Sequence, residues 1–190
     1  MRNKLGSGQA YHCRVSRPER LGVAGPGRRY DLPKVIRYWY PHGFSLTGLR
    51  SGVSGDLIRA AFLLASEYIP IPFKRTYVRD SALITVENGT VGQFDGAGGT
   101  LAEAEVLSLY EPDQRGIWFD PDELWVTSGA GVDQTYVLPV LCHEIGHAVG
   151  FGHMKTAGHL MSPVYDPMVV TPTTKELKAF RKAYPELFKS

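Results

Sequence analysis

The sequence has few cysteines and no long hydrophobic run, and both shortages limit what the protein can be. It contains two cysteines among 190 residues, Cys13 and Cys142, so a disulfide framework is excluded and at most one bridge is possible. Its apolar runs are too short to cross a bilayer, so we expect no membrane span. No hydrophobic segment follows the basic first residues, so no signal peptide is visible.

The net charge is also small, at +2, but it is unevenly distributed. Residues 1–30 contain seven Lys or Arg and one Glu, which gives +6 and leaves −4 for the rest of the chain. The basic residues alternate with Gly, Ser and Pro and show no pattern of aromatic residues for stacking on bases. We therefore expect a flexible basic leader or linker over residues 1–30 and no nucleic-acid partner. Residues 31–190 are long enough for one monomeric domain.

Hydrophobic periodicity predicts both strands and helices in this domain. A helix is expected over residues 55–68 with Ser54 as its N-cap, and another over residues 136–149 with Pro139 in its first turn. A cap signal at residues 173–176 predicts a last helix. Strands are expected at residues 34–40, 73–79, 82–87, 100–107 and 116–120. This order predicts an α+β or mixed α/β domain.

The most informative segment is HEIGHAVGFGH, which begins at His143. His143 and His147 are four residues apart, so they share one face of a helix and can bind the same ion. Glu144 lies one step round the helix, where it can contact a water on the metal without being a ligand. Gly150 can end the helix in a conformation that residues with a Cβ rarely adopt, which lets His153 turn back as a third ligand. Three imidazoles with one open position are typical of catalytic zinc.

Core or surface histidines are the alternative to a metal site. Four of the six histidines, however, fall between residues 143 and 159, and five specified residues match at fixed spacing. The random expectation of such a match in a chain of this length is on the order of 10^-4. The pattern therefore favours zinc binding by His143, His147 and His153.

With these residues the sequence resembles the metzincin metallopeptidases, whose signature is HExxHxxGxxH followed by a methionine turn. HLMSPVY, residues 159–165, puts Met161 eight residues after His153, a spacing similar to that of the matrixins, the matrix metalloproteinase family. The resemblance implies that Met161 packs beneath the imidazoles and that Pro163 and Tyr165 wall the pocket for the residue after the scissile bond. It also implies a twisted, mostly parallel five-stranded sheet with one antiparallel edge strand, an active-site helix, the methionine turn and a C-terminal helix.

A second similarity to matrixins lies upstream, in FDGAGGTLAEA and WFDPDELW. In the family these segments bind one structural calcium ion through oxygen ligands, which suit calcium. Three acidic residues match the ligand positions: Asp95, Asp120 and Glu123. The resemblance also implies that residues 100–106 form an edge strand to which an extended substrate peptide adds, with Leu101 and Ala102 nearest the zinc.

Some positions depart from the matrixin pattern. Matrixins bind a second, structural zinc ion through three His and one Asp. Here Glu103 and Trp118 occupy two of the histidine positions, and the loop before Phe94 has no histidine. We therefore expect this second zinc to be absent. Residue 154 is Met, where matrixins usually carry Ser or Thr.

The roles of both cysteines and of one further histidine need interpretation. Cys13 is similar in kind to the cysteine that keeps matrixin zymogens latent by capping the zinc, but YHCRVSRPE lacks the family's PRCGxPD. A thiolate would be a good zinc ligand, whereas a lone cysteine in a tail is usually incidental, so both interpretations stay open. Cys142 is interpreted as a buried inert thiol, and His159 as a loop residue close to the metal site.

The sequence thus predicts a zinc-dependent endopeptidase that hydrolyses peptide bonds of extended protein substrates. A water activated by zinc attacks the scissile carbonyl, and Glu144 acts as general base. The resemblance implies a secreted enzyme that acts on extracellular proteins such as those of the extracellular matrix. A non-catalytic, zinc-containing peptide-binding module is the alternative, although such a module would not need Glu144. A structural zinc fold would need a fourth ligand, which only Cys13 offers.

Overall fold

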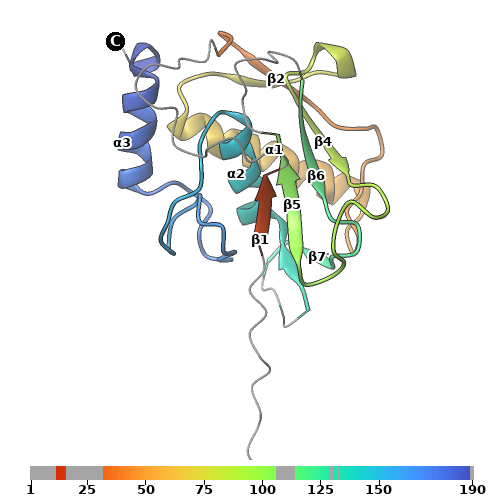
Figure 1. The fold of residues 1–190 in the computed structure, drawn as a ribbon. Coiled ribbons are helices and arrows are strands. Elements are labelled where there is room, and N and C mark those ends of the chain that lie inside the picture. The colour runs from red at the N-terminus through yellow and green to blue at the C-terminus, as the bar shows by residue number, and fades with distance from the viewer. Residues whose placement is uncertain (1–11, 16–31, 106–113, 129–130, 132, 189–190) are drawn as a thin grey trace, which may run out of the picture.

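A six-stranded sheet forms the centre of the molecule (Figure 1). The computed structural model describes residues 12–15, 32–105, 114–128, 131 and 133–188. The strand order is β1-β5-β6-β4-β2-β3. The strands are β1 (His12–Val15), β2 (Ile36–Trp39), β3 (Phe73–Arg75), β4 (Ile84–Asn88), β5 (Thr100–Ala104) and β6 (Arg115–Phe119).

The strand directions agree with the predicted sheet and add one strand to it. β2, β3, β4 and β6 run parallel to one another, and β5 is antiparallel to β6. The expected five-stranded sheet with one antiparallel strand at its edge is therefore confirmed. β1 lies beyond that edge and runs parallel to β5. It lies within the expected leader, for which the sequence pattern predicted no strand.

Helices α1 (Ser51–Tyr68) and α2 (Val137–Ala148) pack against each other, and α2 also contacts β5 and β6. In Figure 1 they lie behind the sheet, and α3 (Thr174–Ala183) stands to one side. The smaller elements are a sheet of β7 (Trp125–Val126) and β8 (Thr135–Tyr136) and two short 3-10 helices, η1 (Arg79–Ser81) and η2 (Pro185–Phe188). In the part of the chain that the structure describes, no helix combines the length and hydrophobicity needed to cross a membrane.

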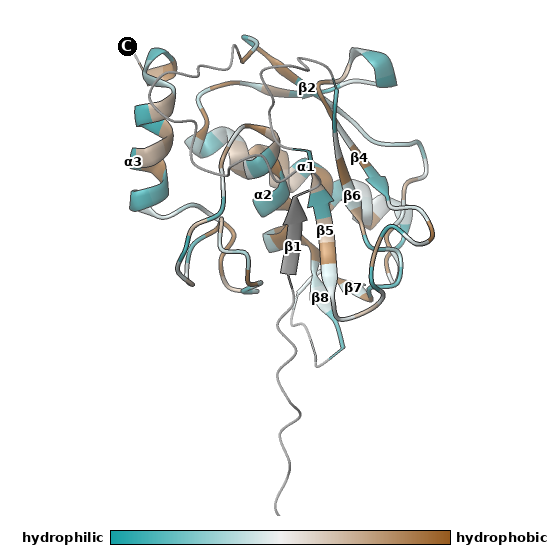
Figure 2. Ribbon diagram, in the orientation of Figure 1, coloured by the Kyte–Doolittle hydropathy of each residue, from teal (hydrophilic) through white to brown (hydrophobic). Residues whose placement is uncertain are grey.

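The hydrophobic core lies between the sheet and the two central helices. Tyr38 of β2 stacks on Phe62 of α1 with ring centroids 3.8 Å apart, and Phe119 of β6 meets Trp125 edge-on at 4.9 Å. Such aromatic pairs bury large apolar areas and hold the sheet against its helices. The turns of α3 alternate between hydrophilic and hydrophobic in Figure 2, as expected for a helix that packs one face.

The ends of some elements differ from the predicted ones. Helix α1 begins at Ser51, and Ser54 is not its N-cap. The buried hydroxyl of Ser54 accepts a hydrogen bond from the backbone N–H of Leu46 at 3.1 Å and donates one to the carbonyl of Arg50 at 3.2 Å. The prediction was wrong because this hydroxyl accepts from the backbone N–H of Leu46 in the preceding loop and not from a backbone N–H at the start of the helix. The predicted capping box of Thr173 at the start of α3 is confirmed.

Candidate metal centre and cleft

Three histidines converge where α2 ends. Helix α2 carries His143 and His147 one turn apart, with ring centroids separated by 4.6 Å. Gly150 follows with a φ of +97°, a conformation that residues with a Cβ rarely adopt, and the chain reverses there. This reversal brings the ring of His153 to 4.6 Å from that of His147. One nitrogen from each of the three rings lies within 4.8 Å of the other two.

Backbone carbonyls orient two of these rings. Nδ1 of His143 lies 2.6 Å from the carbonyl oxygen of Leu160, and Nδ1 of His147 lies 2.8 Å from that of Phe151. Because a carbonyl only accepts, each Nδ1 carries the proton and each Nε2 presents a lone pair. Nε2 of His143 is buried without a hydrogen-bond partner among the described residues, and Nε2 of His147 lies 3.1 Å from that of His153. This donor set fits zinc.

Burial keeps the imidazoles neutral. It lowers the pKa of His143 to about 3 and the pKa of His147 well below its ordinary value, and the neighbouring histidines add to both shifts. The pKa of His153, which is less buried, is lowered by the same cause. Because a metal ion competes with protons for these nitrogens, the lowered pKa values favour metal binding at neutral pH.

Glu144 follows His143 on α2 and is fully buried, with 0% of its surface exposed. A carboxyl group is rarely buried to this extent without a partner or a task, because the charged form loses its hydration. Its place on α2 directly after His143 follows from the sequence pattern. Its role as general base stays a prediction.

Met161 packs against α2 between the two helical histidines. A Cβ on Gly146 would lie 2.4 Å from Sδ of Met161, so glycine leaves the space that the methionine fills. The backbone N–H of Met154, next to His153, donates to the carbonyl of Met161 at 2.7 Å. The methionine turn therefore contacts the helix that carries His143 and His147 and also the segment that carries His153. The sequence pattern did not indicate the contribution of Gly146.

A buried carboxylate from α3 holds the methionine turn in place. Glu176, 1% exposed, accepts from the backbone N–H of Met161 at 2.8 Å and of Leu160 at 3.4 Å. Leu160 in turn supplies the carbonyl that orients His143. Sequence reasoning recognised Glu176 only as part of the α3 capping box, because these contacts join residues far apart in the chain.

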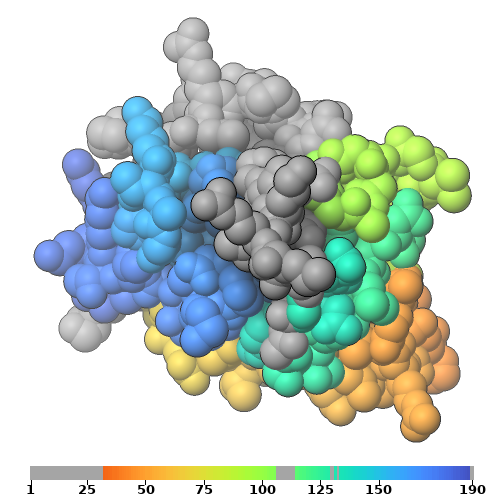
Figure 3. Space-filling view, turned by 90° about the horizontal axis from the view of Figure 1, so that it is seen from below, coloured from red at the N-terminus to blue at the C-terminus, as the bar shows by residue number. Residues whose placement is uncertain are grey.

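Strand β5 contacts α2, the helix that carries His143 and His147. Leu101 and Ala102 are both fully buried in this strand. The outer side of β5, expected to be a free edge, pairs with β1 in a parallel register that puts Cys13 opposite Ala102. Figure 3 shows the molecule from below. The segments that follow α2, in blue, lie on one side of this face, and the glycine-rich loop and β6, in green to teal, lie on the other side.

A small pocket opens beside His143. Its walls come from the start of α2, the methionine turn and the loop that follows. The lining residues are Pro139, Val140, His143, His159, Leu160, Ser162, Val164, Tyr165, Asp166 and Val169. The hydroxyl of Tyr165 accepts a hydrogen bond from the backbone N–H of Tyr136 at 2.9 Å. Tyr165 thus lines this pocket and Pro163 does not, and their roles in substrate binding stay predictions.

The chain also matches known proteins. The family model of the matrixins matches residues 46–184. The chain belongs to the matrixin family. It is 40% identical to matrix metalloproteinase-19 of Homo sapiens over 171 residues and 36% identical to karilysin of Tannerella forsythia over 120 residues. These alignments cover 83% and 58% of this chain but only 32% and 24% of the two relatives, so the chain spans about a quarter to a third of their length.

The three acidic residues expected to bind calcium in this matrixin surround the glycine-rich loop. Oε1 of Glu123 accepts from the backbone N–H of Gly98 at 2.6 Å, and Oδ1 of Asp95 accepts from that of Thr100 at 2.7 Å. Both carboxylates therefore anchor the loop between β4 and β5. Hydrogen bonds of this kind restrain a loop whether or not an ion is bound.

Asp120 gives a more specific indication of a cation. Its side chain is fully buried, and its Oδ2 has no hydrogen-bond partner among the described residues. Burial raises the pKa of Asp120, and the charges of Asp122, Glu123 and Asp95 raise it further. A buried carboxylate oxygen with acidic neighbours fits a calcium ligand, because the ion would offset both costs.

The positions that hold a second zinc in other matrixins carry different interactions here. Nε2 of Gln93 donates to Oε2 of Glu103 at 3.1 Å. The indole ring of Trp118 lies over Gly116, where a Cβ would be 2.1 Å from the ring. An amide, one carboxylate and an indole do not form the nitrogen and sulfur donor set of a structural zinc. These residues therefore do not fit the second ion.

Cys142 and His159 lie outside the group of metal ligands. Burial raises the pKa of Cys142 to about 12, so its thiol stays protonated and does not compete for the metal. Nδ1 of His159 lies 2.8 Å from Oγ1 of Thr173, which connects the loop before the methionine turn to the start of α3. Both residues agree with their interpretation from the sequence.

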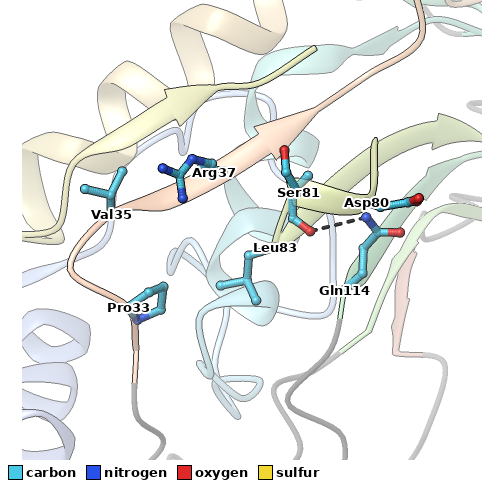
Figure 4. A pocket seen from close by; sticks show the side chains of 8 residues that line it. Pro33, Val35, Arg37, Asp80, Ser81, Leu83 and Gln114 are labelled. Carbon is cyan, nitrogen blue, oxygen red and sulfur yellow. Dashed lines mark hydrogen bonds between the residues drawn. The ribbon is translucent and has the colours of Figure 1, made fainter. Parts of the chain in front are cut away.

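A larger pocket, of about 500 Å3, lies away from the histidines at the start of β2 (Figure 4). Its lining residues are Pro33, Val35, Arg37, Asp80, Ser81, Ala82, Leu83 and Gln114. The side-chain amide of Gln114 donates to the carbonyls of Arg79 and Ala82, which fixes one wall. This pocket shares no lining residue with the one beside His143 and is not part of the metal centre.

We expect the zinc-free protein to lose stability as the pH falls from 6.5, the ordinary pKa of histidine, to about 3, the pKa of buried His143. In this window the unfolded chain binds a proton that the folded chain does not. The free energy of unfolding should therefore fall by up to about 1.4 kcal/mol per pH unit for this residue. Urea titrations of the zinc-free protein across the window measure this slope.

The matched control is His143→Asn, which retains a side-chain N–H for the Leu160 carbonyl but does not titrate. Its stability should fall less steeply than that of the wild type over the same window. Equal slopes for the two proteins would contradict the lowered pKa of His143.

Proposed function

We propose that this matrixin is a zinc-dependent endopeptidase. The observation that carries the proposal is the convergence of three imidazoles, those of His143, His147 and His153, at the end of the helix that also carries the buried Glu144. Three neutral imidazoles fill three of the four positions around zinc and leave one for water or substrate. That arrangement is typical of catalytic rather than structural zinc.

Each residue has a defined task in the proposed reaction. A bound zinc ion would polarise the scissile carbonyl and lower the pKa of the attacking water. Glu144 takes the proton of that water and later gives it to the leaving amine, so no covalent intermediate with the enzyme is needed. The carbonyls of Leu160 and Phe151 keep His143 and His147 in their binding orientation.

The proposed substrates are extended segments of proteins. β5, which contains Leu101 and Ala102, can pair through its outer backbone groups with an added strand, as its pairing with β1 illustrates. The pocket lined by His143 and Tyr165 would receive the side chain after the scissile bond. Secretion, action on extracellular proteins and a monomeric state belong to the same proposal, by analogy with the family.

Two other interpretations have less support. A non-catalytic peptide-binding module would have no use for a carboxyl group directly after a metal-binding histidine, where Glu144 lies. A structural zinc fold requires a fourth protein ligand, and His143, His147 and His153 alone form a candidate metal cluster among the described residues. Cys13 is the residue that could complete such a site.

The same proposal includes one structural calcium ion held by Asp95, Asp120 and Glu123. Support comes from the buried, unpartnered Oδ2 of Asp120 and from the acidic neighbours that raise its pKa. Carboxylate oxygens are the ligands that calcium prefers. An ion there would tie the glycine-rich loop to the segment after β6, beside the cleft.

We also propose that the N-terminal segment blocks the cleft until it is displaced. β1 pairs with β5 and so uses the backbone groups to which a substrate strand would bind. The register puts Cys13 opposite Ala102, the residue that the family resemblance puts nearest the zinc. A thiolate there would be a competent zinc ligand.

The variant Glu144→Gln should lower kcat for an unstructured protein substrate by at least about 100-fold, because general acid–base catalysis contributes about 10²- to 10⁴-fold. Zinc content should not change, because Glu144 is not proposed as a ligand. Substrate cleavage assays and metal analysis of the same sample measure both. Glu67→Gln, on the exposed face of α1, is the control. Wild-type cleavage by zinc-bound Glu144→Gln would refute the mechanism.

Calcium should stabilise the wild type against unfolding but not Asp120→Asn. At a free concentration 100 times its Kd, calcium should add about 2.7 kcal/mol to the free energy of unfolding. Thermal unfolding with calcium and with a chelator, at constant zinc, measures this difference. Asp56→Asn, at an exposed position on α1, should behave like the wild type. The absence of any calcium effect on the wild type would rule out the ion.

Removal of residues 1–30 should raise kcat/KM at least about tenfold, because β1 would no longer compete with the substrate for the cleft. A tenfold change corresponds to about 1.4 kcal/mol. Removal of residues 1–11 alone leaves β1 in place and serves as the matched control. Cys13→Ser in the full chain separates zinc capping by the thiol from blocking by the strand. If all these forms cleave equally well, the N-terminal segment does not block the cleft.

A further inference from the structure

The segment between β3 and β4, residues 76–83, crosses one face of the sheet. Both strands run parallel to β2 and pair with opposite sides of it, so the segment that joins them must cross β2. Tyr38 of β2 stacks on Phe62 of α1, and because side chains alternate along a strand, Trp39 points away from that helix. The guanidinium group of Arg79 lies over the Trp39 ring, 5.6 Å from its centroid. The crossover segment therefore lies on the sheet face opposite α1.

Two apolar side chains of the crossover segment are largely exposed. Tyr77 is 80% exposed and Val78 is 62% exposed. Among the large hydrophobic residues that are exposed in the described part of the chain, these two alone are neighbours in the sequence. A single exposed apolar residue is ordinary, whereas two together form a small apolar surface. We call Tyr77 and Val78 the crossover tip.

Hydrogen bonds hold the crossover tip in one conformation. The hydroxyl of Ser81 donates to the carbonyl of Val78 at 2.8 Å and lies 2.7 Å from the hydroxyl of Thr76. The backbone N–H of Thr76 donates to the carbonyl of Tyr38 at 2.9 Å, which anchors the segment to β2. A partner that binds the tip therefore does not have to order it first, and a preformed surface binds at a lower entropic cost.

Basic side chains lie around the crossover tip. Arg37 of β2 and Lys74 of β3 are exposed and lie directly opposite each other in the sheet, so both are on one face. Like charges at such positions repel each other, and an anionic partner would offset that cost. The guanidinium group of Arg75 lies 3.9 Å from the ring centroid of Tyr40 and 4.7 Å from that of Tyr77. A third cation is thus held in contact with the tip.

Acidic groups do not balance these cations. Glu87 forms an ion pair with Arg79, with 2.9 Å between Oε2 and Nη2, so the charges of this pair offset each other. Asp80 is the one acidic residue within residues 76–83. The three cations described above therefore outnumber it, and the surface around the crossover tip is positively charged.

An apolar tip within a ring of cations favours one kind of partner. A stable protein interface buries about 800 Å2 on each side, far more than two side chains provide. A sulfated polysaccharide would contact the cations and leave the apolar tip without a function. A membrane surface would use both, because tyrosine prefers the headgroup layer and Lys and Arg are attracted to anionic headgroups.

We propose that the crossover tip docks the protein on anionic lipid membranes. Tyr77 and Val78 enter the headgroup layer, and the side chains of Arg37, Lys74 and Arg75 contact the anionic headgroups. The protein is held at the surface of the membrane and does not span it. This inference does not depend on the proposed peptidase function, because docking requires neither the metal centre nor a substrate.

The test measures how much of the zinc-loaded full chain sediments with lipid vesicles. The vesicles contain phosphatidylcholine alone or with about one third phosphatidylserine, and we expect binding to the anionic vesicles only. The double variant Tyr77→Ser, Val78→Ser should lower the partition coefficient at least about tenfold, because apolar burial is lost. The double variant Arg37→Gln, Lys74→Gln should lower it at least about tenfold through lost attraction to the headgroups.

Each double variant has a matched control with the same change of chemistry elsewhere. Leu63→Ser with Val91→Ser replaces two exposed apolar residues away from the crossover tip. Lys175→Gln with Lys178→Gln removes two exposed positive charges from α3. Neither control should change the partition coefficient. The basic residues 1–30 are present in every protein, so any attraction of this segment to the vesicles is common to all of them.

Three outcomes would overturn the inference. They are the absence of wild-type binding to the anionic vesicles, equal binding by the wild type and the tip variant, and an equal loss of binding in the controls. Binding of a soluble sulfated polysaccharide that needs Arg37 and Lys74, together with vesicle binding that does not need the tip, would identify a polyanion as the partner instead. If the double tip variant does not fold, as judged by circular dichroism, Val78→Ser alone repeats the comparison, because a substitution at an exposed position rarely destabilises a protein.

Discussion

Much of this structure depends on keeping three imidazole rings, two of them buried and one half-buried, neutral and turned toward one point. Each requirement draws on a different part of the chain. The helical histidines receive their orientation from the carbonyls of Leu160 and Phe151, and His153 reaches them through the reversal at Gly150. Burial lowers the pKa of all three rings, so their nitrogens stay available to a metal ion.

The support of the metal centre extends to the C-terminal helix. Glu176 is a buried carboxylate that binds the backbone of the methionine turn, and that turn carries the carbonyl partner of His143. The same carboxylate accepts from Thr173, the partner of His159 at the pocket. One side chain of α3 therefore connects the geometry of the metal ligands to the shape of the pocket, and the two cannot vary independently.

Features encoded by neighbouring residues were predictable from the sequence. The α2 helix, the convergence of His143, His147 and His153 and the capping box of α3 each depend on spacings of three to six residues. Features that join distant segments were not. Ser54 looks like a helix cap, yet its hydroxyl is used by Leu46 of the preceding loop. The contacts of Glu176 and the pairing of β1 with β5 gave no local signal.

The sequence by itself determined the identity and spacing of the candidate metal ligands, the position of Glu144 and membership of a recognisable family pattern. Helical periodicity alone places residues four apart on one face. Tertiary structure decided which strand lies beside β5, how Leu160 meets His143 and which side chains line the pocket beside His143. These features depend on which surfaces meet when the chain packs, and distant surfaces are brought together by the sum of many contacts that no short pattern specifies.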